Sequence, residues 1–436
     1  MTFNFTFKHL AIFLGVLSFL SFKNTNPKQD EFNKFFEPNS LRVDFYLSGT
    51  AHSEIFIFQQ LKKTQHWAGK TELISYDSLN LGNYRYNLYD SATNKLLYTK
   101  GFNSLFEEWQ ATPEAKTLQK SFYQVNIMPF PKIVVKYELQ KRNWESGMFE
   151  SIEEFYIDPD NYFILNEQAK KYKYSLIHGS KEANKKIDIA FLAEGYTKGE
   201  MTKFRKDVKR MWEYFITIPP FNQYKDKFNI YAVQSISDDS GVDIPGTKTY
   251  KNTALNFSFY TFNSERYLTS FDLKAMHDAA EVVPYDQIFV LVNTDKYGGG
   301  GFLNYYSATS VDNELSLKVG IHEFGHGFAG LADEYYSSST AYDGFYNLNT
   351  EPWEPNITTL VNFDTKWGNM VDKNTPIPTK REPSYNYEVG VYEGGGYSAK
   401  GIYSPFQNCR MKSNTPRGFC PVCSKAIVRV IHWYCD

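Results

Sequence analysis

The residues with the clearest chemical potential are two histidines with a glutamate directly after the first. His322, Glu323 and His326 form the pattern H-E-x-x-H within the segment IHEFGH. On a helix, the two imidazoles lie about one turn apart on one face and can bind one metal ion. Neutral imidazole nitrogens suit Zn²⁺. Glu323 lies beside the pair, where its carboxylate can take a proton from a water that the metal activates.

A third ligand is expected from the two carboxylates that follow the histidines. Asp333 and Glu334 stand seven and eight residues after His326, in the segment LADEY. Gly330 predicts a helix end in a left-handed turn, which would redirect the chain toward the metal. We predict Asp333 as the third ligand, with Glu334 as the fallback. The remaining carboxylate would then orient a histidine.

The element that must carry the histidines is a helix over residues 312–328. Two apolar rows on opposite sides predict that this helix is buried. Asp312 or Asn313 is expected to cap its start. The alternative is that the two histidines are core residues and that the glutamate is exposed. The rows are Leu315 and Val319 beside the histidines, and Leu317, Ile321, Phe324 and Phe328 on the other side.

The four cysteines of the chain all lie in its last 28 residues. An even, clustered set in an exported protein favours disulfides, whose pairing the sequence leaves open. A structural zinc site built from all four is the alternative, because C-P-V-C has the inner spacing of zinc ligands. The residues are Cys409, Cys420, Cys423 and Cys435.

The N-terminus predicts export. Lys8 and His9 precede thirteen uncharged residues, Leu10 to Phe22, and Lys23 follows them. This pattern is typical of a secretory signal peptide, which we place over residues 1–24, with an uncleaved signal anchor as the alternative. No other apolar run approaches the roughly 18 residues of a membrane span. The protein is therefore expected to be secreted, periplasmic or at the cell surface, without a stable membrane span after signal removal.

Composition and patterning predict a multidomain protein. The chain has 436 residues, of which 42% are apolar, and its net charge of −2 offers no basic excess for nucleic acid. A polar linker is expected over 25–40. Short strand-like runs over 41–168 predict an all-β sandwich. Alternating strands and helices over 169–436, including a buried strand at Ile187–Leu192, predict an α/β catalytic domain.

The segment HEFGHGFAGLADEY (322–335) resembles the active-site signature of the M64 metallopeptidases, often labelled IgA peptidase M64. The segments Cys409-Arg410-Met411 and Phe419 to Cys423 also resemble this family, as does the strand at 187–192 with the following AEGY. The resemblance implies a metzincin-like zincin fold after an N-terminal β-sandwich domain. It further implies a secreted bacterial zinc endopeptidase in which Met411 lies beneath the metal as a Met-turn. It does not imply that immunoglobulin A is the substrate.

These patterns together predict a secreted zinc-dependent endopeptidase of extracellular or host proteins, whose partner is a protein or peptide substrate. One Zn²⁺ would be held by His322, His326 and Asp333, with Glu323 as the base. The alternative is a non-catalytic zinc-containing adhesin or a protein that binds glycan or protein. Glu323 argues against that alternative, because a binding protein needs no general base.

Overall fold

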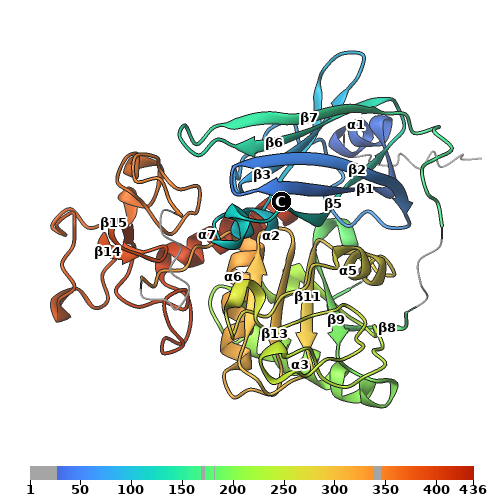
Figure 1. The fold of residues 1–436 in the computed structure, drawn as a ribbon. Helices are drawn as coiled ribbons and strands as arrows, with labels where there is room; N and C mark the ends of the chain where they lie inside the picture. The colour runs from blue at the N-terminus through green and yellow to red at the C-terminus, as the bar shows by residue number, and fades with distance from the viewer. Residues whose placement is uncertain (1–26, 168–171, 181, 337–344) are drawn as a thin grey trace, which may run out of the picture.

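The structure is a computed structural model that describes residues 27–167, 172–180, 182–336 and 345–436 (Figure 1). The predicted signal peptide lies outside the described residues. Among the helices in the described ranges, none is long and apolar enough to cross a membrane. Two sheet-containing regions follow one another along the chain, and a largely irregular segment with one hairpin stands to one side of them.

The N-terminal region consists of two antiparallel sheets stacked on each other (Figure 1, top). Side chains between them are in contact: Tyr86 donates a hydrogen bond to the carbonyl of Ile127, and the rings of Phe58 and Phe155 lie 5.6 Å apart. The prediction of a strand-rich N-terminal region is confirmed. The first sheet has the order β2-β1-β5 and the second β4-β3-β6-β7, with β1 Phe36–Thr50, β2 Ser53–Thr64, β3 Tyr84–Asp90, β4 Leu96–Phe102, β5 Lys120–Pro131, β6 Val135–Arg142 and β7 Phe149–Ile157.

The predicted linker over 25–40 is wrong for the described part of that segment. Residues Pro27–Phe35 form helix α1, and β1 already begins at Phe36. Phe32 and Phe36 are both buried, and their rings lie 5.0 Å apart. Two aromatic side chains four residues apart therefore anchor this otherwise polar segment to the core.

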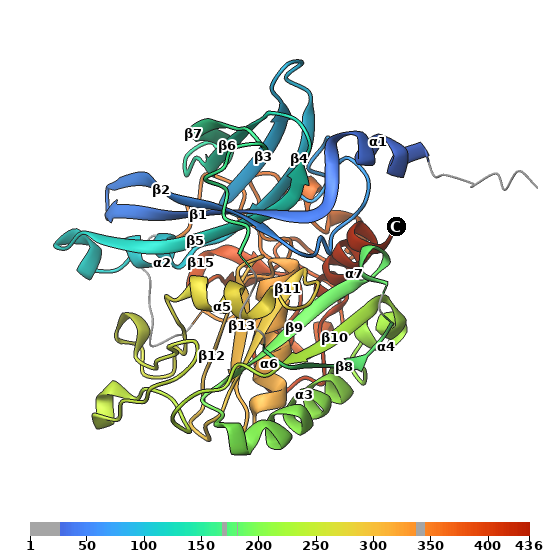
Figure 2. The same ribbon diagram turned by 90° about the vertical axis from the view of Figure 1, so that its right-hand side faces the viewer.

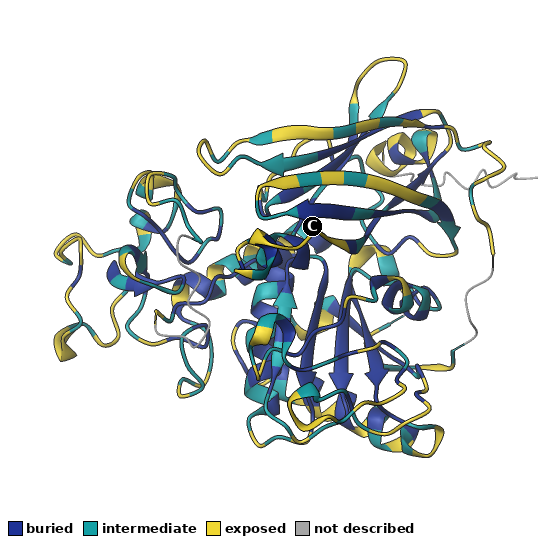
Figure 3. Ribbon diagram, in the orientation of Figure 1, coloured by how far each residue is buried: buried dark blue, intermediate teal, exposed yellow. Residues whose placement is uncertain are grey.

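The second region is built on one six-stranded sheet, in the order β12-β13-β11-β9-β10-β8. The four inner strands are parallel, and the two edge strands β8 and β12 run antiparallel to their neighbours. Every residue of β9, β10 and β11 is buried (Figure 3), as expected for strands covered on both faces. The strands are β8 Tyr174–His178, β9 Ile187–Glu194, β10 Phe228–Val233, β11 Gln287–Val292, β12 Gly299–Phe302 and β13 Tyr306–Ser310.

Helices pack on this sheet, and the β14–β15 hairpin stands to one side of it (Figure 1). Helix α6 packs against β12 and β13, and α7 packs against α6. The remaining elements are α2 Leu105–Gln110, α3 Met201–Phe215, α4 Phe221–Tyr224, α5 Leu273–Ala280, α6 Ser316–Ala329, α7 Pro421–Cys435, β14 Tyr392–Gly395 and β15 Ser398–Ser404.

Helix α6 begins later than the sequence predicts. It starts at Ser316 rather than at residue 312, and neither Asp312 nor Asn313 caps it. The Asn313 side chain instead accepts a hydrogen bond from the backbone N–H of Leu315, which forms a turn ahead of the helix. The other end agrees with the prediction, because Gly330 terminates the helix in a left-handed conformation with φ of 60°.

Buried ion pairs join the two regions. The guanidinium of Arg42 on β1 contacts both Asp44 and Asp278 at 2.6 Å, and Lys62 on β2 contacts Glu281 at 2.8 Å. Figure 2 shows α5, which carries Asp278, directly beneath the first N-terminal sheet. Removing one partner of such a buried pair leaves an uncompensated charge, so the pairs fix how the regions meet.

Candidate functional site

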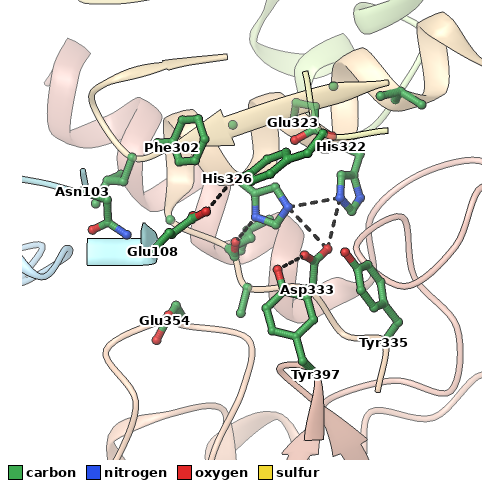
Figure 4. A pocket seen from close by; sticks show the side chains of 18 of the residues that line it. Asn103, Glu108, Phe302, His322, Glu323, His326, Asp333, Tyr335, Glu354 and Tyr397 are labelled. Atoms are coloured by element: carbon green, nitrogen blue, oxygen red, sulfur yellow. Dashed lines mark hydrogen bonds and ion pairs between the residues drawn. The ribbon is translucent and has the colours of Figure 1, made fainter. Parts of the chain in front are cut away.

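Three side chains from α6 and the segment after it meet in one pocket (Figure 4). The Nε2 atoms of His322 and His326 lie 3.1 Å apart. The Oδ1 atom of Asp333 lies 3.2 Å from the first and 3.4 Å from the second. The i, i+4 spacing on α6 brings the rings together, and the turn at Gly330 returns the chain so that Asp333 faces them.

The hydrogen bonds of the histidines define which ring nitrogens carry protons. Nδ1 of His322 bonds the carbonyl of Arg410 at 3.0 Å, and Nδ1 of His326 bonds the carbonyl of Leu331. A carbonyl only accepts, so both Nδ1 atoms are donors. In a neutral ring, Nε2 then bears the lone pair. Asp333 Oδ1, also an acceptor, is buried without a hydrogen bond of its own. Three acceptors thus converge, and a cation would stabilise them.

The pKa values of the site agree with this need for positive charge. Burial lowers the pKa of His326, but the Asp333 carboxylate raises it more, to about 9. Burial raises the pKa of Asp333, but the positive charge of His326 and the close contacts of both imidazoles with Oδ1 bring it well below its ordinary value. This corner of the pocket therefore favours a proton or a metal ion between the three side chains.

The donor set fits Zn²⁺. Nitrogen and oxygen ligands at about 2.0 to 2.2 Å from a tetrahedral ion lie about 3.3 to 3.6 Å from one another. The three separations here, 3.1, 3.2 and 3.4 Å, are close to that range. His322, His326 and Asp333 can therefore hold one ion together. The fallback ligand, Glu334, lies instead with three of the cysteines.

Asp333 is held in place by its surroundings. The hydroxyl of Tyr397 donates to its Oδ2 at 2.6 Å, and the N–H of Gly396 donates to its carbonyl at 2.8 Å. Both residues lie in the turn between β14 and β15. The side-chain amide of Asn356 forms two hydrogen bonds with the backbone of the preceding Ala332, at 2.7 and 2.9 Å. The segment is irregular, yet its backbone is fixed on several sides.

Glu323 lies against the edge strand β12. A Cβ atom on Gly299 would stand 2.8 Å from Glu323 Oε1, and one on Gly301 would stand 2.2 Å from the Glu323 carbonyl oxygen. Only glycines therefore allow β12 to approach α6 so closely. Burial raises the pKa of Glu323, and the neighbouring histidines oppose this only in part. Such a carboxylate is suited to accepting and returning a proton.

Met411 lies in the turn after Cys409, next to Arg410, whose carbonyl binds His322. It is fully buried, and its sulfur would be 2.9 Å from a Cβ on Gly325 of α6. The carbonyl of Met411 accepts the N–H of Glu334 at 2.8 Å. Because Arg410 of the same turn binds His322, this turn supports both the helix and the segment that carries Asp333.

The structure does not bring the four cysteines together. Cys420 caps the start of α7 and Cys435 is its last residue, so about 22 Å of helix separates them at 1.5 Å per residue. Cys435 Sγ lies 3.9 Å from the carbonyl of Lys227. All four thiols are free, contrary to the predicted disulfides. The other three gather around Glu334.

The N-terminal region also contributes to the pocket, which the sequence did not suggest. Asn103 and Glu108, from the β4–α2 turn and from α2, line it opposite the histidines (Figure 4). Tyr267 donates a hydrogen bond to Glu108. Burial raises the pKa of Glu108 to about 7, although that hydrogen bond lowers it in part. No local pattern marks these residues, because they reach the site only through packing of the two regions.

Comparison with known proteins covers most of the chain. A family model described as IgA Peptidase M64 matches residues 176–384 and 380–431, more than half of the chain. A second model, described as Peptidase M64 N-terminus, matches residues 31–152. No curated protein matches the sequence. The first match covers the six-stranded sheet, α6 and the turn at Cys409–Met411, and the second covers the N-terminal sheets.

Proposed function

Because the chain belongs to the IgA peptidase M64 family, we propose that it is an exported zinc-dependent endopeptidase that hydrolyses peptide bonds of extracellular proteins. Family membership supports peptidase activity. The observation that carries the zinc assignment is the convergence of three acceptors, two Nε2 atoms and one carboxylate oxygen, within 3.4 Å of one another. His322, His326 and Asp333 would hold the ion.

Zn²⁺, when bound there, supplies a Lewis acid for the scissile carbonyl and acidifies a water molecule. The remaining chemistry belongs to the chain. Glu323 accepts the proton of the attacking water on its carboxylate and returns it to the leaving amine. Its raised pKa brings the carboxyl closer to the pH at which both transfers are efficient. Tyr397 holds Asp333, and the carbonyls of Arg410 and Leu331 hold the imidazoles.

The finer fold assignment is part of the same proposal. A mixed sheet with the antiparallel strand β12 at its edge, a helix bearing H-E-x-x-H and a buried methionine beneath it are consistent with a metzincin-like zincin domain. Met411 would then form the apolar floor of the site. The stacked N-terminal sheets would form the β-sandwich that precedes it. Export rests on the charged and apolar pattern of residues 1–24.

The proposal is tested with a mixed peptide library and the purified protein. We expect cleavage that stops when a chelator removes the metal and returns with added Zn²⁺. Glu323→Gln should keep its metal, because the three proposed ligands stay in place, and lose activity by about 10² to 10⁴. Retained binding of a target protein with no cleavage by the zinc-loaded protein would instead favour the non-catalytic adhesin. Near-normal turnover in Glu323→Gln would remove Glu323 from the mechanism.

A further inference from the structure

A second cluster of ligand-type side chains lies on the other side of the segment that carries Asp333. It consists of Glu334, Cys409, Cys420 and Cys423, all of them buried. One carboxylate oxygen and three sulfur atoms lie within 4.8 Å of one another. None of these four residues lies among the proposed catalytic ligands, and the peptidase mechanism uses none of them.

The separations match one tetrahedral ion. Sulfur ligands at about 2.3 Å from Zn²⁺ lie about 3.8 Å apart, and a sulfur and an oxygen ligand about 3.5 Å apart. The Sγ atoms of Cys409 and Cys423 are 3.8 Å apart. Cys423 Sγ is 3.1 Å from Glu334 Oε1, which is about 0.4 Å shorter than the ideal value. We propose that Glu334, Cys409, Cys420 and Cys423 bind a second, structural Zn²⁺ in this protein.

Hydrogen bonds to the sulfur atoms support this assignment. The backbone N–H of Cys420 points to Cys409 Sγ at 3.1 Å, and that of Cys423 points to Cys420 Sγ at 3.5 Å. Cys420 is the N-cap of α7, and the positive end of that helix favours thiolates beside it. Donors of this kind stabilise the anionic sulfur that a metal requires. Binding of the ion would release the thiol protons to solvent.

The carboxylate of Glu334 provides an independent indication. Its Oε1 accepts a hydrogen bond from Asn356 at 3.0 Å, whereas Oε2 is buried without a partner. A buried carboxylate with an unpaired oxygen among three thiols is costly unless a cation lies next to it. Soft sulfur ligands with one carboxylate in a tetrahedral arrangement favour Zn²⁺ over Mg²⁺ or Ca²⁺.

The second ion would support the first site without touching substrate. Glu334 follows Asp333 directly, and Cys409 belongs to the turn whose Arg410 carbonyl binds His322. The N–H of Glu334 also bonds Met411 of that turn. An ion held by Glu334 and Cys409 would therefore fix the segment and the turn relative to each other. The four cluster residues thus act as positioning residues for the catalytic ligands.

The test uses the full chain and a readout that depends on sulfur. We expect two zinc equivalents per chain in the original protein and one in His326→Ala, which disrupts only the histidine site. X-ray absorption of His326→Ala should show sulfur ligands. Cobalt substitution of that variant should give thiolate-to-metal charge transfer, because the histidine site has no sulfur. Cys423→Ser should lose one equivalent, while the control Cys435→Ser keeps both, since Cys435 lies outside the cluster.

Two results would overturn the assignment. One is a His326→Ala variant that binds no zinc, or that binds an ion without sulfur ligands. The other is a disulfide in the cluster, which would leave two thiols open to alkylation after unfolding in chelator, where the proposal expects four. Cobalt spectra of His326→Ala decide the question even if Cys423→Ser does not fold. They are also independent of peptide cleavage, so a failure of the proposed peptidase activity would not be mistaken for a failure here.

Discussion

Tyr397 offers a sharp test of how the metal site is held. Its hydroxyl donates a 2.6 Å hydrogen bond to Oδ2 of Asp333, and its ring packs against Tyr335 at 5.5 Å. Tyr397→Phe keeps the ring and removes only the hydroxyl. A hydrogen bond to a charged group contributes about 1.5 to 3 kcal/mol. If that energy orients Asp333 for the ion, zinc affinity should fall about 10- to 140-fold, at 1.4 kcal/mol per tenfold.

The measurement is a competition between the protein and a chromophoric chelator of known affinity, together with kcat at saturating zinc. We expect weaker zinc binding with kcat restored when the site is filled. Tyr336→Phe is the matched control, because it removes a hydroxyl from a neighbouring tyrosine that does not line the pocket and whose ring lies against Arg381 and Lys412. Its zinc affinity should stay within about twofold of the original, as for a surface change.

The opposite pattern would refute the reasoning. If Tyr397→Phe binds zinc normally but loses kcat at saturating metal, the hydroxyl acts on the reacting carbonyl of the substrate and not through Asp333. Tyr397 would then be an oxyanion donor. If neither quantity changes, the hydrogen bond contributes nothing to either step.

Three further outcomes are expected. Gly299→Ala places a Cβ 2.8 Å from the carboxylate of Glu323, so kcat should fall about 10²-fold at unchanged zinc content. An unchanged kcat would show that β12 shifts to make room for the methyl group without displacing Glu323. Burial and the carboxylate of Asp286 raise the pKa of Asp188, so the native state holds this proton and stability is lost as pH rises above about 4, the unfolded value. Asp188→Asn should remove that loss and raise the free energy of unfolding at pH 8 by about 1 kcal/mol or more, as measured in urea, whereas an unchanged pH slope would contradict it. Burial raises the pKa of Glu108 to about 7, so this carboxyl becomes negatively charged as the pH rises through 7. The preference for substrates with Lys or Arg should therefore grow over that range, and it should be about tenfold smaller in Glu108→Gln. Equal kcat/KM ratios for such substrates in both proteins would exclude a role of Glu108 in specificity.

The grouping of the candidate site residues could be predicted because their geometry is local. His322 and His326 are one helical turn apart in any α-helix, and Gly330 marks the turn that brings Asp333 back. These contacts lie within a segment of twelve residues, His322 to Asp333. The start of α6 could not be predicted as well, because Asp312 and Asn313 are plausible caps, whereas the N-cap position is taken by Leu315, whose side chain makes no capping hydrogen bond.

Contacts between segments that are far apart in the chain could not be predicted from the sequence. Tyr397 stands 64 residues after Asp333, and Glu108 belongs to the other region. Thirty-three tyrosines in the chain gave no reason to choose Tyr397. The prediction that all four cysteines lie together was wrong for a different reason. A helix over 421–435, with Cys420 at its start, places Cys435 about 22 Å away, so assigning that helix first would have excluded the set of four.

The choice between Asp333 and Glu334 has a physical explanation in the segment itself. After Gly330 the chain leaves the helix, and residues 331–336 have no helical structure. Asp333 faces the two histidines, while Glu334 faces the three cysteines. Two neighbouring side chains of this irregular segment thus point to different sides, so the two carboxylates can serve two different sites. Exchanging the two residues would leave each site with a carboxylate of the wrong length. Under the two proposed sites, the D-E pair after the turn supplies one ligand to each of two ions, with the Cys409–Met411 turn supporting both.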